Sequence, residues 1–412
     1  MKIVDIRPVL LTAPYGGSGA QASRRSACFV EVETDTGLVG IGETYAGVYV
    51  PELAAGIVDW FKPFLTGTAF KTGGGDLEAL MRSDVGRSAL ETIAPLLQGL
   101  DARNPDLVFR LGSWLASYVG RTGLTVIVLS AIENAVWDLL GQSLGVPVHV
   151  LLGGAVHRRL PLYASGGVPT FSRDQLVQQA TCARNAGYRG FKMRANFFAY
   201  QPDVEVERVA AVRAAIGPDM TLAFDAVQSF NLKPWSVKEV VHMLERLAPY
   251  RLEWAEEMLP PFDPAPYAEL RRSTATPISG GEGITTAAQF EQWLRAGAFD
   301  LAQPDATIIG GIGEARRACE SARAQHVRVA MHVWGSAPAI MANYNLAFTQ
   351  PNCVWLERPV MNNPLEEEML VDPLRIEQGY VLPPTAPGLG VKLTQEIKAK
   401  YPYVPGSASL FG

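Results

Sequence analysis

The chain has 412 residues, 48% of them hydrophobic and 19% charged, with a net charge of −5 at pH 7. This length predicts either two domains or one large barrel with additions, around a sizeable core. Nucleic acid is excluded as a main partner, because phosphate binding needs a basic face. The longest apolar runs are too short to span a bilayer, and the N-terminus lacks a signal-peptide pattern. The four cysteines form no CxxC motif, which fits reduced thiols, so we expect a cytoplasmic protein without membrane contacts.

The first 128 residues predict an α+β domain. Alternating apolar residues from Ile3 to Val9 predict a strand, and the stretch from Phe29 to Glu43 predicts a hairpin that turns at Asp35. Helical patterns follow at four places, which are Pro51–Leu65, Asp76–Leu97, Pro105–Val119 and Thr125–Leu144. A small antiparallel sheet followed by helices is typical of this fold class.

From about residue 160 the pattern changes to short apolar runs separated by amphipathic segments, which is typical of a closed parallel β/α barrel. The eight runs are Leu160–Ala164, Gly190–Met193, Thr221–Phe224, Leu252–Ala255, Pro277–Gly281, Asp300–Gln303, Arg328–Met331 and Val354–Leu356. The segments between them include Arg173–Ala186, Val204–Ile216, Val237–Leu247, Ala287–Ala296 and Ile312–Gln325. Because no helix-length amphipathic segment follows the eighth run, we predict a (β/α)7β barrel over residues 129–367. A doubly wound open sheet fits less well, since no glycine-rich dinucleotide turn follows the first strand.

Seven of the predicted strands end in ionisable residues. These residues are Lys192 with Arg194, then Asp225, Glu256, Glu282, Asp305, His332 and Glu357. Successive strand ends lie 23 to 33 residues apart, close to the length of one β/α unit. A single Asp or Glu after a strand is most often a helix cap or a turn residue. Seven such positions in phase instead predict one active site, because barrel active sites lie at the C-terminal ends of the strands.

The residue types divide into three groups with different chemistry. Asp225, Glu256 and Glu282 supply hard oxygen ligands from three consecutive strands, which suits one Mg²⁺. Asp305 and His332 lie on adjacent strands, where a carboxylate can fix the tautomer of a histidine and raise its basicity.

Lys192 and Arg194 form the third group, and their alternation on one strand points both into the mouth of the barrel. Glu357 lies across from them and can form hydrogen bonds. A divalent metal, a base and cations on one rim fit the removal of a proton α to a carboxylate. We therefore expect a small-molecule carboxylate as the substrate.

The motifs around these positions resemble those of the enolase superfamily, in particular its mandelate racemase and muconate lactonizing enzyme-like subgroup. The resemblance covers most of the chain and rests on Val30–Glu43, Ser130–Leu139 with Leu151–Gly154, Trp254–Glu257, Gly280–Glu282, and Gln303–Asp305 with Gly310–Ile312. It implies that Asp225, Glu256 and Glu282 bind Mg²⁺, that Asp305 and His332 form the base, and that Glu357 helps to stabilise an enolate. It also implies a homo-oligomer and an N-terminal capping domain to which residues 368–412 return.

Three positions depart from the pattern of the family. The third strand ends in Asp225-Ala226-Val227, where Asp-x-Asn is usual, and Met258 replaces the proline after the paired glutamates, which leaves both Glu256 and Glu257 as candidate ligands. Arg194 stands where racemases carry a second lysine as a base, and an arginine remains protonated.

Arg194 therefore favours a lyase that dehydrates a sugar acid to a 2-keto-3-deoxy acid. A racemase, an epimerase or a lactone cycloisomerase is the alternative, and the intact His332–Asp305 pair disfavours a catalytically silent barrel. Tyr15 resembles part of the loop that closes over substrate in this family, and Tyr45 is a second candidate for substrate contact. The sequence does not identify the sugar acid.

Overall fold

The computed structural model describes residues 1–16, 22–68, 100–196 and 199–407 and contains a closed barrel of eight parallel strands. The helix expected at Asp76–Leu97 lies outside the described residues. The barrel strands are β4 (Leu160–Gly166), β5 (Gly190–Arg194), β6 (Thr221–Asp225), β7 (Ala255–Glu256), β8 (Ile278–Gly280), β9 (Leu301–Ala302), β10 (Arg328–Met331) and β11 (Cys353–Pro359). β11 pairs with β4 in parallel and closes the ring, and the antiparallel pair β12 (Ile376–Glu377) and β13 (Tyr380–Val381) extends β4 on its other side.

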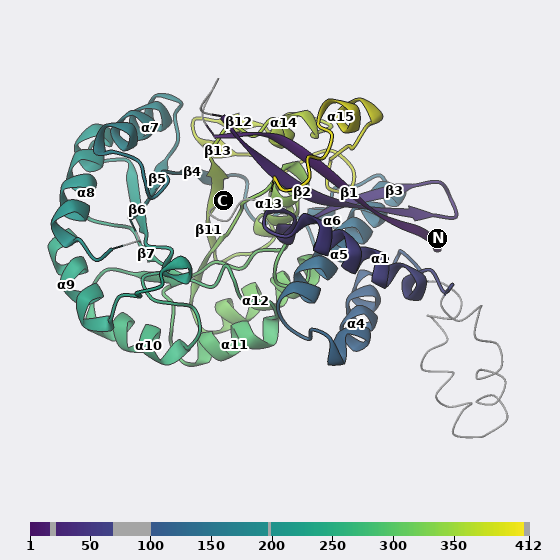
Figure 1. The fold of residues 1–412 in the computed structure, drawn as a ribbon, viewed down its shortest axis with the longest axis horizontal. Helices are drawn as coiled ribbons and strands as arrows, with labels where there is room; N and C mark the ends of the chain where they lie inside the picture. The colour runs from purple at the N-terminus through teal and green to yellow at the C-terminus, as the bar shows by residue number, and fades with distance from the viewer. Residues whose placement is uncertain (17–21, 69–99, 197–198, 408–412) are drawn as a thin grey trace.

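Seven helices connect the eight strands, and they surround the ring (Figure 1). They are α7 (Arg173–Asn185), α8 (Pro202–Ile216), α9 (Val237–Leu247), α10 (Pro264–Ser273), α11 (Ala287–Arg295), α12 (Ile312–Ala324) and α13 (Ala337–Ala347). α7 and α9 each begin with a complete capping box, at Ser172 with Gln175 and at Ser236 with Glu239. The predicted (β/α)7β architecture is confirmed.

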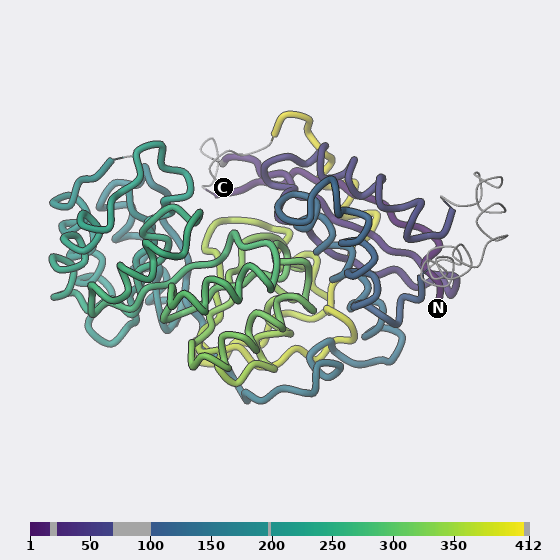
Figure 2. Tube along the Cα trace, turned by 90° about the horizontal axis from the view of Figure 1, so that it is seen from below, coloured from purple at the N-terminus to yellow at the C-terminus, as the bar shows by residue number. Residues whose placement is uncertain are grey.

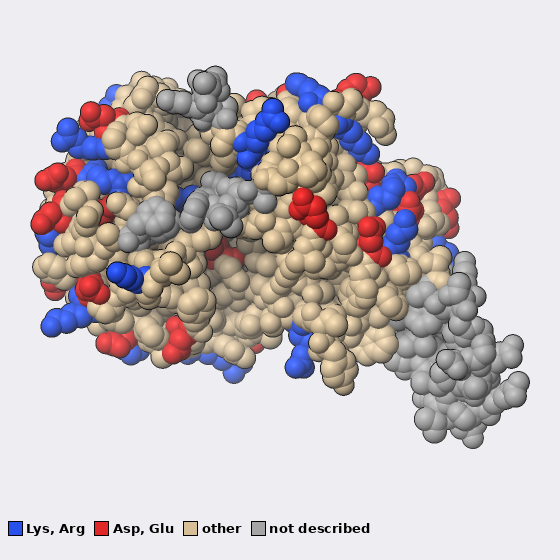
Figure 3. All heavy atoms as spheres, in the orientation of Figure 1, with Lys and Arg blue, Asp and Glu red and all other residues tan. Residues whose placement is uncertain are grey.

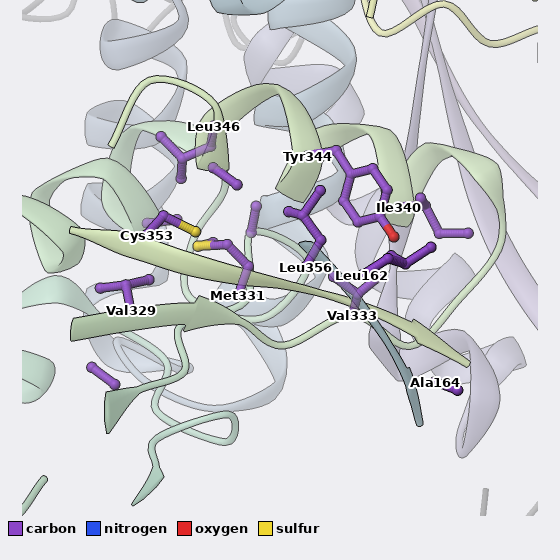
Figure 4. Packing of buried hydrophobic residues seen from close by; sticks show 14 of the residues in the cluster. Leu162, Ala164, Val329, Met331, Val333, Ile340, Tyr344, Leu346, Cys353 and Leu356 are labelled. Carbon is purple, nitrogen blue, oxygen red and sulfur yellow. The ribbon is translucent and has the colours of Figure 1, made fainter. Parts of the chain in front are cut away.

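Helix α13 differs from the other barrel helices because every one of its residues is buried. Ile340, Tyr344 and Leu346 pack against side chains of β10 and β11, including Met331 and Leu356 (Figure 4). A helix that is apolar on all sides carries no amphipathic period, so the sequence pattern does not reveal it.

The N-terminal part is an antiparallel sheet covered by helices, as predicted. Its strands are β1 (Ile3–Gly16), β2 (Ala22–Thr34) and β3 (Val39–Thr44), followed by the short helix η2 (Tyr45–Val48), and its helices are α1 (Pro51–Leu65), α4 (Pro105–Leu115) and α5 (Leu124–Leu144). Gly40 and Gly42 allow β3 to lie directly on α5, because a Cβ at either position would overlap the carbonyl oxygen of Ala135 or Ala131.

The last described residues return to this sheet (Figure 2). α15 (Gln395–Lys400) places Lys398 Nζ 2.6 Å from Glu31 Oε1 of β2, and the backbone N–H of Thr12 in β1 donates to the carbonyl oxygen of Tyr401. The N-terminal sheet lies beside the barrel, so residues of its strands and of η2 can reach the mouth.

Among the described helices, α5 is the one long and apolar enough to cross a membrane by length and composition. It packs against β3, α4 and α12, and 78% of its apolar window is buried. These contacts make it a core helix of this fold. On the face seen in Figure 3, acidic and basic side chains of the described residues are interspersed, in agreement with the near balance of charges in the sequence.

Candidate active site

The barrel interior has an apolar layer below a polar one. Tyr163, Ala223, Trp254, Leu301 and Ala330 form a buried cluster inside the ring. Side chains alternate along a strand, so a residue two positions after a member of this cluster also points inward. Four such residues carry polar side chains of the site. They are Ser165, Asp225, Glu256 and His332. Strand register places Arg194, Asp225 and Glu256 side by side across β5, β6 and β7.

His332 and Asp305 form the predicted dyad geometry. His332 Nδ1 lies 2.7 Å from Asp305 Oδ2, and Asp305 Oδ1 accepts hydrogen bonds from Asn343 Nδ2 and Thr307 N. The other ring nitrogen, Nε2, lies 3.5 Å from Glu282 Oε2. Burial lowers the pKa of His332, but Glu282 and the hydrogen bond to Asp305 outweigh it and raise this pKa to about 10.

Lys192 lies at the centre of a group of carboxylates. Its ammonium donates to Glu256 Oε1, lies 2.9 Å from Glu357 Oε1 and lies 3.7 Å from Asp225 Oδ2. Burial lowers the pKa of Lys192, but Glu256 and Glu357 hold it well above its usual value. Burial raises the pKa of Glu357, but Lys192 and His332 lower it to about 2, so Glu357 is an ionised acceptor that orients Lys192.

The three predicted metal ligands lie at this mouth, but with different environments. Glu256 is fully buried and its oxygens accept hydrogen bonds from Lys192, Trp254 Nε1 and Gln303 Nε2. Burial and the nearby Glu256 raise the pKa of Asp225 to about 8, and burial also raises the pKa of Glu282. Within the described part of the chain, no three Asp, Glu, His or Cys side chains are close enough together to hold a metal ion as they stand.

Glu257 is a fourth carboxylate at the same place. It is buried, accepts a hydrogen bond from Ser229 Oγ at 3.2 Å, and has a pKa raised well above its usual value by burial and by Glu282 and Asp225.

The backbones of Glu257 and Val227 are both left-handed, each with φ at 43°. A β-branched residue is strained in this region, and the Val227 N–H donates to Asp225 Oδ1. The strained position is the one where the family pattern has an asparagine.

The charge balance of this mouth fits a divalent cation. Six carboxylates meet there, and among the described residues the cationic side chains within ion-pair distance of them are Lys192, Arg194 and the dyad histidine. The carboxylates are Asp225, Glu256, Glu257, Glu282, Asp305 and Glu357. A set of oxygen donors with excess negative charge is the chemistry that Mg²⁺ prefers, so the residues present fit this ion.

Arg194 and the two predicted tyrosines line the mouth near the dyad. Arg194 Nε lies 3.9 Å from Asp225 Oδ2, beyond hydrogen-bond distance, and its guanidinium lies over the ring of Trp334. The rings of Tyr45 and His332 are 5.8 Å apart at their centroids, in an edge-to-face arrangement. Tyr15 is buried, with its ring centroid 6.4 Å from that of Trp334. All the predicted site residues therefore lie at one mouth.

Two residues of this mouth had no assigned role from the sequence. Gln303 belongs to the Gln-Pro-Asp motif, and its amide binds both Glu256 and Ser279. Arg25 comes from β2 and is buried beside Tyr15 and Trp334. Nothing in the sequence distinguishes Arg25 from the adjacent Arg24, which is exposed.

The fold and the site define a β/α-barrel enzyme with a His–Asp dyad and a ring of carboxylates. The chain belongs to the enolase superfamily, in its mandelate racemase and muconate lactonizing enzyme group. The description "Mandelate racemase / muconate lactonizing enzyme, N-terminal domain" matches residues 3–153, and "Enolase C-terminal domain-like" matches residues 175–397.

Relatives of known activity catalyse more than one reaction. A D-galactarolactone cycloisomerase of Agrobacterium fabrum is 29% identical over 97% of this chain and 99% of its own length. An L-talarate/galactarate dehydratase of Salmonella typhimurium is 29% identical over 74% of this chain and 73% of its own length. The solved structure of a racemase from Streptomyces coelicolor A3(2) with bound magnesium is 25% identical, covers 97% of this chain and 99% of its own, and has a TM-score of 0.77. The relatives thus include both lyases and isomerases.

Proposed function

We propose that this enzyme removes the proton α to the carboxylate of an acid sugar and dehydrates the sugar to a 2-keto-3-deoxy acid. The observation that carries the proposal is that, among the described residues of the mouth, His332 is the one side chain arranged as a base. His332 is held by Asp305 on one side, whereas Arg194 and Lys192 remain protonated. One base permits elimination from one face of the substrate, but it does not supply the second base that a racemase normally needs.

His332 performs both proton transfers of this reaction. Its Nδ1–H is held by Asp305, so Nε2 of the neutral ring accepts the α-proton as the enediolate forms. Burial lowers the ring pKa, but the free carboxylates, Glu282 first among them, raise it to about 10, and a cation held by Glu282 would lower that pKa and favour the neutral ring. The resulting imidazolium returns the proton to the β-hydroxyl, which leaves as water in a syn elimination. The enol product then tautomerises to the 2-keto-3-deoxy acid.

Lys192 and Arg194 bind and orient the substrate carboxylate. Among the described residues, the Nε of Arg194 has no hydrogen-bond partner, so it can donate to an incoming oxygen. Lys192 is aimed into the mouth by Glu357, whose other oxygen is fixed by the backbone N–H of Val333. Glu357 therefore stabilises the enolate through Lys192, by keeping the ammonium in place.

Asp225, Glu256 and Glu282 would hold one Mg²⁺, with Glu257 as the neighbouring carboxylate that can replace Glu256. When bound, this ion supplies a Lewis acid that stabilises negative charge developing on the substrate carboxylate.

We expect Glu282→Gln to weaken Mg²⁺ binding measured by calorimetry, and chelation to abolish turnover in the unmodified enzyme. Comparing Glu256→Gln with Glu257→Gln identifies the ligand, since the true ligand causes the larger loss of Mg²⁺ affinity. Unchanged Mg²⁺ affinity in all three variants would contradict the site.

A library of sugar monoacids and diacids, assayed for 2-keto acid formation with Mg²⁺, tests the proposed function. We expect at least one acid to form a 2-keto acid and to lose the mass of one water, whereas His332→Asn should form none. Absence of a 2-keto acid from the whole library, together with no α-proton exchange in D₂O, would overturn the proposal.

A lactone cycloisomerase is the second candidate, and the A. fabrum cycloisomerase favours it because the similarity extends over 97% of this chain. The same dyad would serve that reaction. Mass spectrometry separates the two, because a cycloisomerase gives a product with the mass of its substrate. Sugar-acid lactones therefore belong in the same library.

A further inference from the structure

Arg25 is a buried cation for which the described residues supply no ion-pair partner. It lies in β2 with 6% of its surface exposed, and neither its Nε nor its Nη2 has a hydrogen-bond acceptor. Among the residues that the structure describes, no carboxylate lies within ion-pair distance of this guanidinium. A buried charge without a partner is costly, so its retention calls for an anion that the described residues do not supply.

Two further donors around Arg25 also have no partner among the described residues. They are the Tyr15 hydroxyl and Trp334 Nε1. The Arg25 guanidinium lies 4.7 Å from the Tyr15 ring centroid and 5.5 Å from that of Trp334, and the Arg194 guanidinium lies 4.5 Å from the Trp334 ring centroid. Unpartnered atoms that are all donors and gather around one indole fit oxygen atoms of an anion.

The nearby carboxyl groups do not satisfy Arg25. The charge of Glu43 helps to raise the pKa of Arg25 from beyond ion-pair distance. The oxygens of Glu43, however, accept hydrogen bonds from the backbone N–H groups of Ser336 and Ala339. The charge of Glu366 also interacts with Arg25 from beyond ion-pair distance; its Oε2 lies 3.6 Å from Arg358, and its buried Oε1 has no hydrogen-bond partner among the described residues. Glu43 is thus occupied elsewhere, and Glu366 lies too far from Arg25 to form an ion pair with it.

These donors belong to the same mouth as the dyad. Trp334 follows His332 by two residues. The ring of Tyr45 contacts that of His332, and Tyr45 also interacts electrostatically with Arg25. Arg194 lies between the two regions, near Asp225 on one side and over Trp334 on the other. A molecule with its α-carboxylate at Lys192 can therefore extend toward Arg25.

We infer that Arg25, with Tyr15 and Trp334, binds a second carboxylate at the far end of the substrate. Building on the proposed function, this assigns the substrate to the sugar diacids instead of the monoacids. An arginine is suited to this task, because its planar fork matches the two oxygens of a carboxylate.

The test compares hexaric acids, the six-carbon sugar diacids, with hexonic acids of matched configuration. We expect the unmodified enzyme to prefer the diacid, and Arg25→Gln to reduce the diacid-to-monoacid ratio of kcat/KM by about 30-fold, mostly through KM. Arg25→Lys should recover part of this ratio because it restores the charge without the fork. The matched control is Arg24→Gln, which removes the neighbouring, exposed charge and should leave the ratio unchanged.

Tyr15→Phe covers the case in which Arg25→Gln fails to fold. It removes one donor only, and we expect a decrease of about threefold in the same ratio. Equal losses on diacids and monoacids in both variants, or a preference of the unmodified enzyme for monoacids, would overturn the inference while leaving the proposed function intact. Stimulation of monoacid turnover by added phosphate would show a separate anion and would also overturn it.

Binding without turnover separates the two proposals. Calorimetry with His332→Asn, which lacks the base, measures the affinity for a hexaric acid directly. If no acid is turned over but the diacid still binds and Arg25→Gln weakens that binding, the proposed reaction fails and the carboxylate site stands. If the diacid binds no more tightly than the monoacid, the carboxylate site fails.

Discussion

The protonation state of His332 is controlled by the carboxylates on both sides of its ring. Asp305 contacts Nδ1 and Glu282 lies near Nε2. Because the ring transfers the proton and Asp305 only orients and charges it, we expect His332→Asn to lose about 1,000-fold in kcat. Asp305→Asn should lose about 100-fold, the effect of removing an orienting partner. Exchange of the substrate α-proton with D₂O at the unmodified rate by His332→Asn would show that another group is the base.

Asp305→Asn also changes the titration of the ring itself. In the metal-free protein the pKa of His332 is raised to about 10, partly by the Asp305 hydrogen bond and charge. Without that charge the imidazolium loses a stabilising partner, so its pKa should fall and the neutral ring should appear at lower pH. An NMR titration measures this, and His332→Asn identifies the signal among the five histidines. A pKa that stays near 10 in Asp305→Asn would contradict this account of the dyad.

Arg194 determines the stereochemical outcome. A guanidinium cannot remove a proton at neutral pH, but a lysine at the same place can act as a base when its pKa is lowered. We expect Arg194→Lys to allow slow α-epimerisation, seen by NMR as α-proton exchange of both C2 epimers in D₂O. The unmodified enzyme should exchange one epimer only, and rapid exchange of both would replace the dehydratase proposal by an epimerase.

At the scale of single elements, Glu133 of α5 fixes the start of α12. It is buried, and its oxygens accept hydrogen bonds from the backbone N–H groups of Ile312 and Gly313 and from Trp137 Nε1. Burial raises the pKa of Glu133 to about 8, so the effect of this contact rests on its hydrogen bonds and not on a full charge at the helix N-terminus. Glu133 thereby joins the helix before the barrel to its sixth helix.

Glu133→Gln should therefore destabilise the protein without changing its chemistry. The amide presents an NH₂ group to a backbone N–H, and we expect the free energy of unfolding to fall by about 2 kcal/mol. Glu320→Gln is the matched control, because Glu320 is exposed on α12 and forms a surface ion pair with Arg316, so its loss should be within about 0.5 kcal/mol. Urea unfolding measures both, and equal effects of the two substitutions would refute the role of Glu133.

Elements and site residues were predictable to different degrees. The barrel strands and the residues at their ends follow a regular spacing, so the sequence reveals them. Helix α13 escapes the amphipathic pattern because it is buried on all sides. Arg25 escapes because its neighbour Trp334 lies far away in the sequence, so its burial depends on how the N-terminal sheet meets the barrel. The metal ligands remain a prediction, since Lys192 and the surrounding hydrogen bonds decide which glutamate is available.

At the scale of the whole molecule, two buried carboxyl groups join the N-terminal sheet to the rest. Glu43 of β3 binds the backbone N–H groups at the start of α13, and Asp138 of α5 binds those of Ile41 and Leu389. Burial raises the pKa of each to about 7, from ordinary values of 4.5 and 3.8. Both are fully buried, so solvent screens these shifts little.

The sign of the resulting pH dependence follows from these raised values. Between about pH 4 and pH 7 the folded protein keeps protons that the unfolded chain has already released, so unfolding releases protons and becomes easier as the pH rises. Each group contributes a slope of up to about 1.4 kcal/mol per pH unit in this range.

We therefore expect the free energy of unfolding, measured with urea and a chelator, to fall from about pH 4 to pH 7. Glu43→Gln and Asp138→Asn should each flatten the slope, because the remaining amide does not titrate, whereas the exposed Glu320→Gln should not. A profile that rises with pH, or one that both buried substitutions leave unchanged, would mean that these carboxyl groups are ionised in the folded protein.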